Sequence, residues 1–411
     1  MTDDRERTAL KAGPEPAAAG AARPRLLYID NLRITLTALV VLHHTAVTYG
    51  NIPAWYYTEP AKDGSGLLLD VFVMFNQAFF MGFFFMIAGY FTPASYDRKG
   101  ARPFFRDRLK RLGIPLLVFL LLIRPLTGLS GYADLRAEFA EQGKSLPYWL
   151  YYVLSWDAGP LWFVEVLLVF AMLYALIRRR GGARRALGSA GQAGQAGQAG
   201  RRTAQVPPAP RPLRPAAVVG FTVALALATY LWRIVVPTDT YVPYLGLPTP
   251  NFMPQYASFF VLGVLAFRRG WAQSLPRVAG GVGFALATVA TLAYLPFVVT
   301  VEAATLTGHG TWQSLITAAW ESTFAVGMVL GLTVVFRERL NRQGPTAAFL
   351  SRHAFAVYVI HAPVLVGLGL ALRWLHAPAA AKFALVAALA VPLCWAVAYA
   401  VRRLPHADRV L

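Results

Sequence analysis

The sequence predicts an all-α fold, a polytopic membrane bundle of about ten transmembrane helices with both termini in the cytoplasm. Hydrophobic residues make up 56% of the 411 residues and charged residues only 14%, whereas a soluble domain usually carries about a quarter charged residues. The apolar residues gather in runs close to the roughly 20 residues that a helix needs to cross a bilayer. Lys and Arg lie mostly between these runs, which is typical of cytoplasmic loops.

The apolar runs define the predicted spans in order along the chain. Each is long enough for a membrane helix, and an even number of spans places both ends of the chain on the same side. The predicted spans are 29–49, 66–92, 112–131, 159–177, 215–236, 250–267, 278–299, 313–336, 350–372 and 380–401.

The charge distribution sets the predicted orientation. Arg33, Arg124 and Arg233 fall inside or at the edges of spans, and most of the other Lys and Arg residues lie in the segments assigned to the cytoplasm. This asymmetry favours an orientation with the N-terminus in the cytoplasm. The predicted location is the lipid bilayer of the inner (plasma) membrane. The asymmetry also explains the net charge of +19 better than a nucleic-acid partner does. The predicted outward loops hold only Lys62, Arg136, Lys144, Arg373 and Lys382.

Composition divides the chain into five parts. Residues 1–25 are polar and lack the apolar core of a signal peptide, so we expect a disordered cytoplasmic N-terminus. Residues 26–177 form the first four helices of the membrane domain, and 216–402 form the last six. Between them, 178–215 combines Arg-rich ends, Ala-Gly-Gln repeats and a Pro-rich tail, a composition that predicts a disordered cytoplasmic linker. Residues 403–411 are a cytoplasmic tail.

The first span carries the polar residues that are the strongest functional candidates. Ionisable side chains inside a membrane are costly and usually functional. Arg33 and His44 are eleven residues apart, close to three helical turns, so they share one face at a separation of roughly 16 Å. Asp30 lies one turn before Arg33 and roughly 21 Å from His44, too far to orient it. His43 projects about 80° away from this face.

This arrangement suits a large anionic substrate that enters from the cytoplasm. Arg33 would hold its charged part, and the reactive end would reach His44, where a neutral imidazole can take a proton from an acceptor hydroxyl. The alternative is that Arg33 only anchors the helix at the cytoplasmic surface while His43 and His44 are packing residues.

Further basic residues follow the second span. The loop 98–111 is rich in Lys and Arg, and Arg106 and Arg111 are candidates to bind the charged part of an anionic substrate. Ordinary sidedness also explains a basic loop at this place. Arg124 falls within the third span, so it needs a carboxylate or phosphate partner or a place near the outward interface.

Three more ionisable residues lie inside later spans. Glu165, Glu321 and His361 are candidates to orient His44 or to bind an acceptor hydroxyl. We favour Glu165, because it follows a Leu-Trp-Phe motif, and place His361 second. The alternative is that Glu165, Glu321 and Arg233 pair across helices and only hold the bundle together.

Several short motifs follow one another in a specific order. Together they resemble the acyltransferase 3 family of bacterial membrane proteins, and among its members they look most like the glucan-biosynthesis protein C branch. Ala88 departs from the pattern, because many members have Ser there. The motifs are Tyr28-Ile-Asp-Asn-Leu-Arg33 with His44, Phe84-Phe-Met-Ile-Ala-Gly89-Tyr-Phe, the basic stretch from Arg102 to Pro115, Gly159-Pro-Leu-Trp162-Phe163, Tyr256 with Phe260 and Gly263, and Ser351-Arg-His-Ala-Phe-Ala-Val-Tyr358-Val-Ile-His361-Ala-Pro363.

The resemblance implies a membrane-bound O-acyltransferase. Family members move acyl groups, often acetyl or succinyl, from cytoplasmic acyl-CoA to sugars or other hydroxyl acceptors of the cell envelope. The family's Arg and His correspond to Arg33 and His44. We therefore expect acyl-CoA as co-substrate, with no bound cofactor and no metal. The predicted catalytic residues are His44, Glu165 and His361, and the predicted donor-binding residues are Asp30, Arg33, Arg106 and Arg111.

A transporter is the alternative function. His44 and Glu165 could relay protons in a proton-coupled transporter of an acylated glycan or a small acid. Against this, the sequence has no obvious internal repeat and no pair of Gly- or Pro-broken helices in matching halves. Neither the acyl group, the acceptor nor the oligomeric state follows from the sequence, because pocket shape decides the first two.

Overall fold

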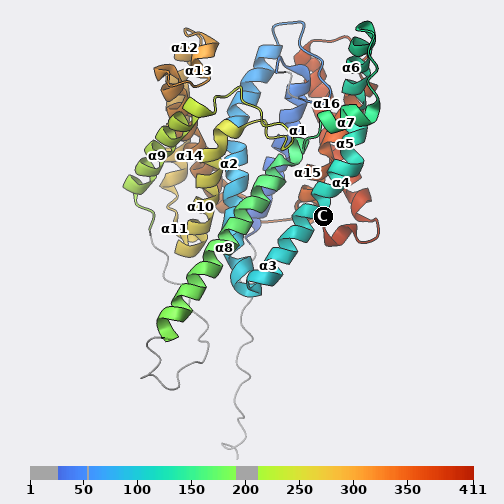
Figure 1. Cartoon of the computed structure of the whole chain (residues 1–411). Coiled ribbons are helices and arrows are strands. Elements are labelled where there is room, and N and C mark those ends of the chain that lie inside the picture. Colours follow the sequence, from blue (N-terminus) through green and yellow to red (C-terminus); the bar gives the residue numbers. More distant parts are fainter. Residues whose placement is uncertain (1–25, 53–54, 191–211) are drawn as a thin grey trace, which may run out of the picture.

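The computed structural model describes residues 26–52, 55–190 and 212–411, and within these ranges the chain is a bundle of α-helices (Figure 1). Short 3-10 and π-helical turns interrupt or join some of them. The helices are α1 (Leu27–Tyr49), α2 (Gly66–Lys99), α3 (Ala101–Arg108), α4 (Ile114–Val118), α5 (Arg124–Thr127), α6 (Leu129–Glu141), α7 (Tyr148–Leu154), α8 (Trp162–Ala190), α9 (Pro215–Val235), α10 (Met253–Arg269), α11 (Trp271–Ser274), α12 (Val278–Val298), α13 (Ala303–Leu306), α14 (Trp312–Arg339), α15 (Pro345–Ala371) and α16 (Ala379–Arg402).

The predicted membrane bundle is confirmed. In the described part of the chain, 7 helices are long and apolar enough to cross a membrane, or 8 if the bent pair Ala101–Thr127 and Gly131–Glu141 is one span. The predicted spans 29–49 and 250–267 are also helical, as α1 and α10. They fall outside that count because polar residues lower the hydropathy of α1, while α10 has only 17 residues.

Hydrogen bonds show which helix ends lie together. Asn31 Nδ2, in the first turns of α1, donates to the carbonyls of Leu340 and Arg342 at 2.6 and 2.9 Å, in the turn between α14 and α15. Arg402, at the end of α16, donates to the carbonyl of Arg352 near the start of α15. We call this side of the bundle the basic end, and the side where α1 ends, with the loop 50–65, the opposite end.

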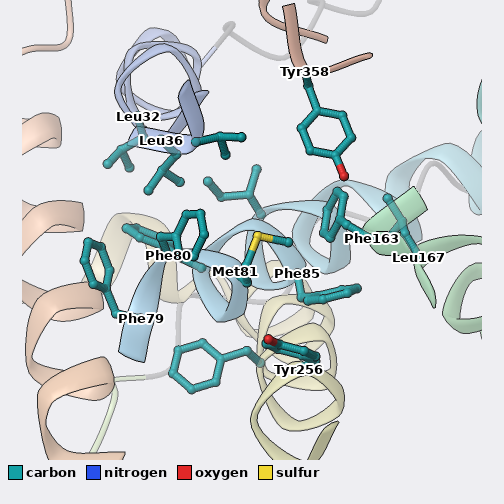
Figure 2. Packing of buried hydrophobic residues seen from close by; sticks show 14 of the residues in the cluster. Leu32, Leu36, Phe79, Phe80, Met81, Phe85, Phe163, Leu167, Tyr256 and Tyr358 are labelled. Atoms are coloured by element: carbon teal, nitrogen blue, oxygen red, sulfur yellow. The ribbon is translucent and has the colours of Figure 1, made fainter. Parts of the chain in front are cut away.

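Aromatic and aliphatic side chains fill the centre of the bundle (Figure 2). The helix α2 is apolar on nearly all sides and contacts α1, α10 and α14, which is typical of a helix buried within a bundle. Its Phe85 ring lies 4.6 Å from Phe163 on α8 and 5.1 Å from Tyr256 on α10. The side chain of Phe85 therefore joins three helices by aromatic packing.

Two glycines allow α2 and α10 to cross closely. A Cβ atom at Gly89 would lie 2.1 Å from the carbonyl oxygen of Phe260, and one at Gly263 would lie 2.0 Å from that of Met86. Membrane helices often approach through such small residues, because packing replaces the missing hydrophobic driving force.

We expect Gly263→Leu to destabilise the fold by about 1–3 kcal/mol, because the new side chain must push two helix backbones apart. The measurement is the thermal unfolding midpoint of the purified protein. Gly220→Leu on α9 is the matched control, since a Cβ atom at Gly220 meets nothing within 4 Å. Equal midpoints for the two variants would contradict the close crossing.

The structure differs from the predicted linker boundary. The helix α8 continues to Ala190, past the predicted boundary at 177, and extends below the other helices in Figure 1. Its apolar part forms the helix, and the Arg and Ala residues that follow are good helix formers that can prolong it. The remaining linker residues 191–211 and the N-terminal residues 1–25 lie outside the described residues.

Candidate functional site

The structure brings His44 and His361 into contact. The helices α1 and α15 both begin at the basic end, and they place these two rings side by side toward the opposite half of the bundle. His361 Nε2 lies 3.2 Å from His44 Nδ1, and the ring centroids are 5.0 Å apart. His361 is fully buried, whereas His44 is half-buried.

Two carbonyl oxygens determine the direction of this hydrogen bond. His361 Nδ1 lies 2.6 Å from the Tyr358 carbonyl, and His44 Nδ1 lies 3.0 Å from the Val40 carbonyl. Because a carbonyl oxygen only accepts, each Nδ1 carries the proton, and a neutral imidazole then keeps a lone pair on Nε2. His44 Nδ1–H thus donates to both Val40 and His361 Nε2. The lone pair of His44 Nε2 is left to accept a proton.

A tryptophan from the opposite end covers the His44 ring. Trp55 stacks on His44 with ring centroids 4.1 Å apart and planes inclined by 25°. On α1, the neighbouring His43 turns away and stacks on Phe80 of α2 at 5.0 Å. His43 is therefore a packing residue in this structure, while His44 lies between the His361 ring and the loop at the opposite end.

The loop 50–65 that carries Trp55 is fastened to α16. The Asp63 carboxylate accepts from the backbone N–H of Ala379 at 2.9 Å, and Ser65 Oγ accepts from that of Ala380 at 3.0 Å. Both bonds satisfy donors in the first turn of α16, as an N-cap does. Hydrogen bonds from the Ser65 hydroxyl and from the backbone N–H groups of Ala379 and Ser65 lower the pKa of the Asp63 carboxyl, that from the Ser65 hydroxyl most. Lys382 adds an ion pair with Glu59.

Arg124 has the carboxylate partner that the sequence required. Its guanidinium pairs with Asp157 at 3.1 Å, donates to the Ser155 carbonyl at 2.7 Å and lies over the Tyr56 ring at 4.9 Å. Burial, followed by the Asp157 carboxylate, raises the pKa of the Tyr56 hydroxyl, which donates to Asp157 at 3.4 Å. This cluster at the opposite end holds Tyr56, and with it the adjacent Trp55, in place.

Glu165 occupies a different position from the one we favoured. It lies half-buried in the first turn of α8, and none of the hydrogen bonds of the described residues joins it to His44. The residue beside His44 is His361, the second choice from the sequence. Glu321 forms a 2.7 Å ion pair with Arg233 between α14 and α9 instead of a contact with His44.

Arg33 and Asp30 lie near the basic end of α1. Arg33 Nη1 donates to Asp30 Oδ1 at 3.2 Å, and the Arg33 side chain is 36% exposed against 10% for Asp30. The buried Asp30 carboxylate therefore orients the more exposed Arg33 guanidinium, and the guanidinium is the group that can bind an anionic ligand.

The predicted basic loop has its own carboxylate. Asp107 pairs with Arg111 at 3.2 Å and with Lys99 at 2.8 Å. Arg111 remains 62% exposed, and Arg106 is exposed on α3. Both predicted donor-binding arginines therefore lie at the surface of the basic end.

Sequence reasoning missed residues that position the site. Asn31 fastens the start of α1 to the turn before α15, and Gln343 Nε2 donates to its side-chain oxygen at 3.0 Å. These hydrogen bonds hold the start of α1 against the turn before α15, and this arrangement brings His44 into contact with His361. An amide inside an otherwise apolar run was the available signal, as for any polar residue in a membrane helix. Trp55 gave no signal beyond its aromatic character.

The comparisons with known proteins agree with one another. A family model described as an acyltransferase domain, that of the acyltransferase 3 family, matches residues 26–399. The chain is 26% identical over 361 residues to proteins called Glucans biosynthesis protein C from Escherichia coli O157:H7 (strain EC4115 / EHEC) and from Escherichia coli (strain K12). Each alignment covers 84% of this chain and 83% of the relative. No solved structure matches it significantly.

Proposed function

This chain belongs to the acyltransferase 3 family, and we propose that it moves an acyl group from cytoplasmic acyl-CoA to a hydroxyl of an envelope glycan. It is a multi-pass membrane acyltransferase. In the proposal the membrane is the inner (plasma) membrane and the basic end faces the cytoplasm, as the distribution of Lys and Arg favours.

The hydrogen bond between His44 and His361 carries the proposal. It leaves the lone pair of His44 Nε2 free to act as general base. The acceptor hydroxyl attacks the thioester carbonyl while His44 Nε2 takes its proton. The C–S bond then breaks, the acyl group stays on the acceptor oxygen as an ester, and His44 returns the proton to the CoA thiolate. His361 Nε2 accepts from the His44 imidazolium throughout and is a positioning residue.

Donor binding is assigned to the basic end. Arg33, held by Asp30, is the cation nearest the reaction path along α1, roughly 16 Å from His44 by helical rise. Arg106 and Arg111 add exposed positive charge for the phosphates of CoA. The extended arm of the donor would cross the distance between Arg33 and His44.

The acceptor is proposed to approach from the opposite end. Trp55 comes from the loop 50–65 at that end, and its ring covers His44. To reach His44, the acceptor must displace the Trp55 ring or pack against its face. The relatives' printed name refers to glucan biosynthesis, which makes a glucan the first acceptor to test.

Labelled acyl transfer tests this proposal. The purified protein is reconstituted in proteoliposomes with radiolabelled acetyl-CoA or succinyl-CoA and glucan oligosaccharides. We expect alkali-labile label on the glucan, which is typical of an O-ester. Proton-coupled uptake of a small acid or glycan, with no label transferred from either donor, would favour the transporter instead.

His361→Ala is expected to lower kcat by about 10²-fold, because His44 loses the acceptor that fixes its ring and tautomer. The effect on KM for acyl-CoA should be small, since His361 does not lie at the donor end. His361→Gln offers an amide oxygen to His44 Nδ1 and should restore part of kcat.

His353→Ala on the same helix is the control for this experiment. His353 Nδ1 lies 2.7 Å from the Phe349 carbonyl in the same backbone pattern, but near the basic end and away from His44. A similar fall in kcat for both alanine variants would assign His361 to general helix packing instead.

A further inference from the structure

A crevice at the basic end lies between the start of α12 and the end of α14. It has a volume of about 680 Å³. The helix α12 is at the edge of the bundle, and its Val282 and Val289 side chains are 49% and 64% exposed. In a membrane, exposed apolar side chains on a peripheral helix face lipid, so the crevice is reached from the bilayer. Its lining residues are Arg277, Gly280, Gly281, Phe284, Val334, Val335, Glu338 and Arg339.

The rim of the crevice is positively charged. Arg277 is 85% exposed and pairs with Glu338 at 2.6 Å. Glu338 also pairs with Arg337 at 2.9 Å, so this single carboxylate is shared. None of the ion pairs within the described ranges involves Arg339, which is exposed on the same rim. The rim thus holds two arginines, Arg277 and Arg339, and one carboxylate, which Arg337 beside the crevice also shares, so it retains positive charge for an anion.

The floor of the crevice is apolar and kept open by one glycine. Phe284, Val334 and Val335 supply its apolar walls. Gly280 and Gly281 differ in role: a Cβ atom at Gly280 would lie 2.7 Å from Val334, whereas one at Gly281 meets nothing within 4 Å. Gly280 therefore lets the two helices approach, and Gly281 leaves space that no protein atom fills.

We propose that this crevice binds an anionic phospholipid of the cytoplasmic leaflet. The phosphate lies between Arg277 and Arg339, and the acyl chains run over the apolar floor. Basic pockets between membrane helices on the cytoplasmic side are suited to acidic lipid headgroups. The site needs the same orientation as the proposed function, with the basic end in the cytoplasm, but it takes no part in the acyl transfer.

Lipid retention by the full-length protein tests the site. The protein is delipidated in detergent and placed in nanodiscs of phosphatidylcholine, alone or mixed with phosphatidylglycerol. We measure the thermal unfolding midpoint and, by native mass spectrometry, the lipid that stays bound. The wild type is expected to retain phosphatidylglycerol and to unfold at a higher temperature in its presence.

Two variants act on the two parts of the site. Arg277→Gln with Arg339→Gln should weaken phosphatidylglycerol binding roughly fivefold for each charge removed. Gly281→Leu fills the floor and should abolish retention, whereas Gly220→Leu, at another open glycine, should retain the lipid like the wild type. Folding of each variant is checked by its midpoint in phosphatidylcholine alone.

Three results would overturn the proposal. The wild type could retain phosphatidylcholine and phosphatidylglycerol equally, or both site variants could retain phosphatidylglycerol as the wild type does. Inorganic phosphate could also raise the midpoint as much as the lipid does, which would indicate an anion site without a lipid. Because neither the bound lipid nor the unfolding midpoint measures acyl transfer, each of these results leaves the acyl-transfer proposal standing.

Discussion

His44→Ala is expected to reduce kcat for acyl transfer by roughly 10²–10⁴-fold, the usual contribution of a general base. The variant removes Nε2, whose lone pair is oriented by the Val40 carbonyl and His361. The KM for acyl-CoA should change little, because Arg33 and the basic loop remain. The measurement is the initial rate of label transfer to the acceptor at saturating donor.

The adjacent His43 is the matched control for His44. His43 is 8% exposed, stacks on Phe80 and has no described hydrogen bond to His361. His43→Ala should therefore lower the unfolding midpoint and leave kcat close to that of the wild type. If the His44→Ala enzyme transfers acyl groups at the wild-type rate, the assignment of His44 as base is wrong.

The second large effect is expected in stability, at the ion pair of Arg233 and Glu321. Arg233 is fully buried, pairs with Glu321 at 2.7 Å and lies over the Phe252 ring at 5.0 Å. Glu321→Ala leaves a buried guanidinium without its counter-ion, which costs about 3–5 kcal/mol. We expect a large fall in the thermal unfolding midpoint of the reconstituted protein.

A surface ion pair of the same length provides the comparison. Arg268 and Asp97 also lie 2.7 Å apart, but their side chains are 34% and 38% exposed, so Asp97→Ala should cost less than about 1 kcal/mol. The double variant Arg233→Met with Glu321→Leu removes both buried charges and should recover much of the lost stability. Equal losses for Glu321→Ala and Asp97→Ala would show that burial adds nothing to the Arg233 pair.

Both predictions concern polar groups that the sequence already marked as unusual. The long apolar runs predicted the membrane bundle, and the ionisable residues within them were candidates for a partner or a function. Arg124 illustrates this: the sequence required a carboxylate or an interfacial place, and Asp157 supplies the carboxylate at the opposite end. The identity of the partner did not follow, because Asp157 lies outside the apolar runs.

His44 is a second residue that the sequence marked without identifying its partner. Helical periodicity placed Arg33 and His44 on one face of α1 and excluded Asp30 as the partner of His44, since both arguments use a single helix. The Leu-Trp-Phe motif ranked Glu165 above His361, but His361 is the residue in contact with His44. Nothing in the spacing along one helix specifies which face of α15 or α8 turns toward α1.

The sequence by itself determined the class of the protein and the spacing of the candidate residues on its first helix. Run length and charge asymmetry are local properties, and they suffice for a membrane bundle with Arg33 and His44 about three turns apart. Only the tertiary structure decided that His361 orients His44, that Trp55 covers it, and that Arg233 pairs with Glu321. These contacts join residues far apart in the chain. They depend on how side chains interlock between helices, as at Gly89 and Gly263, and no periodicity within one segment encodes that fit.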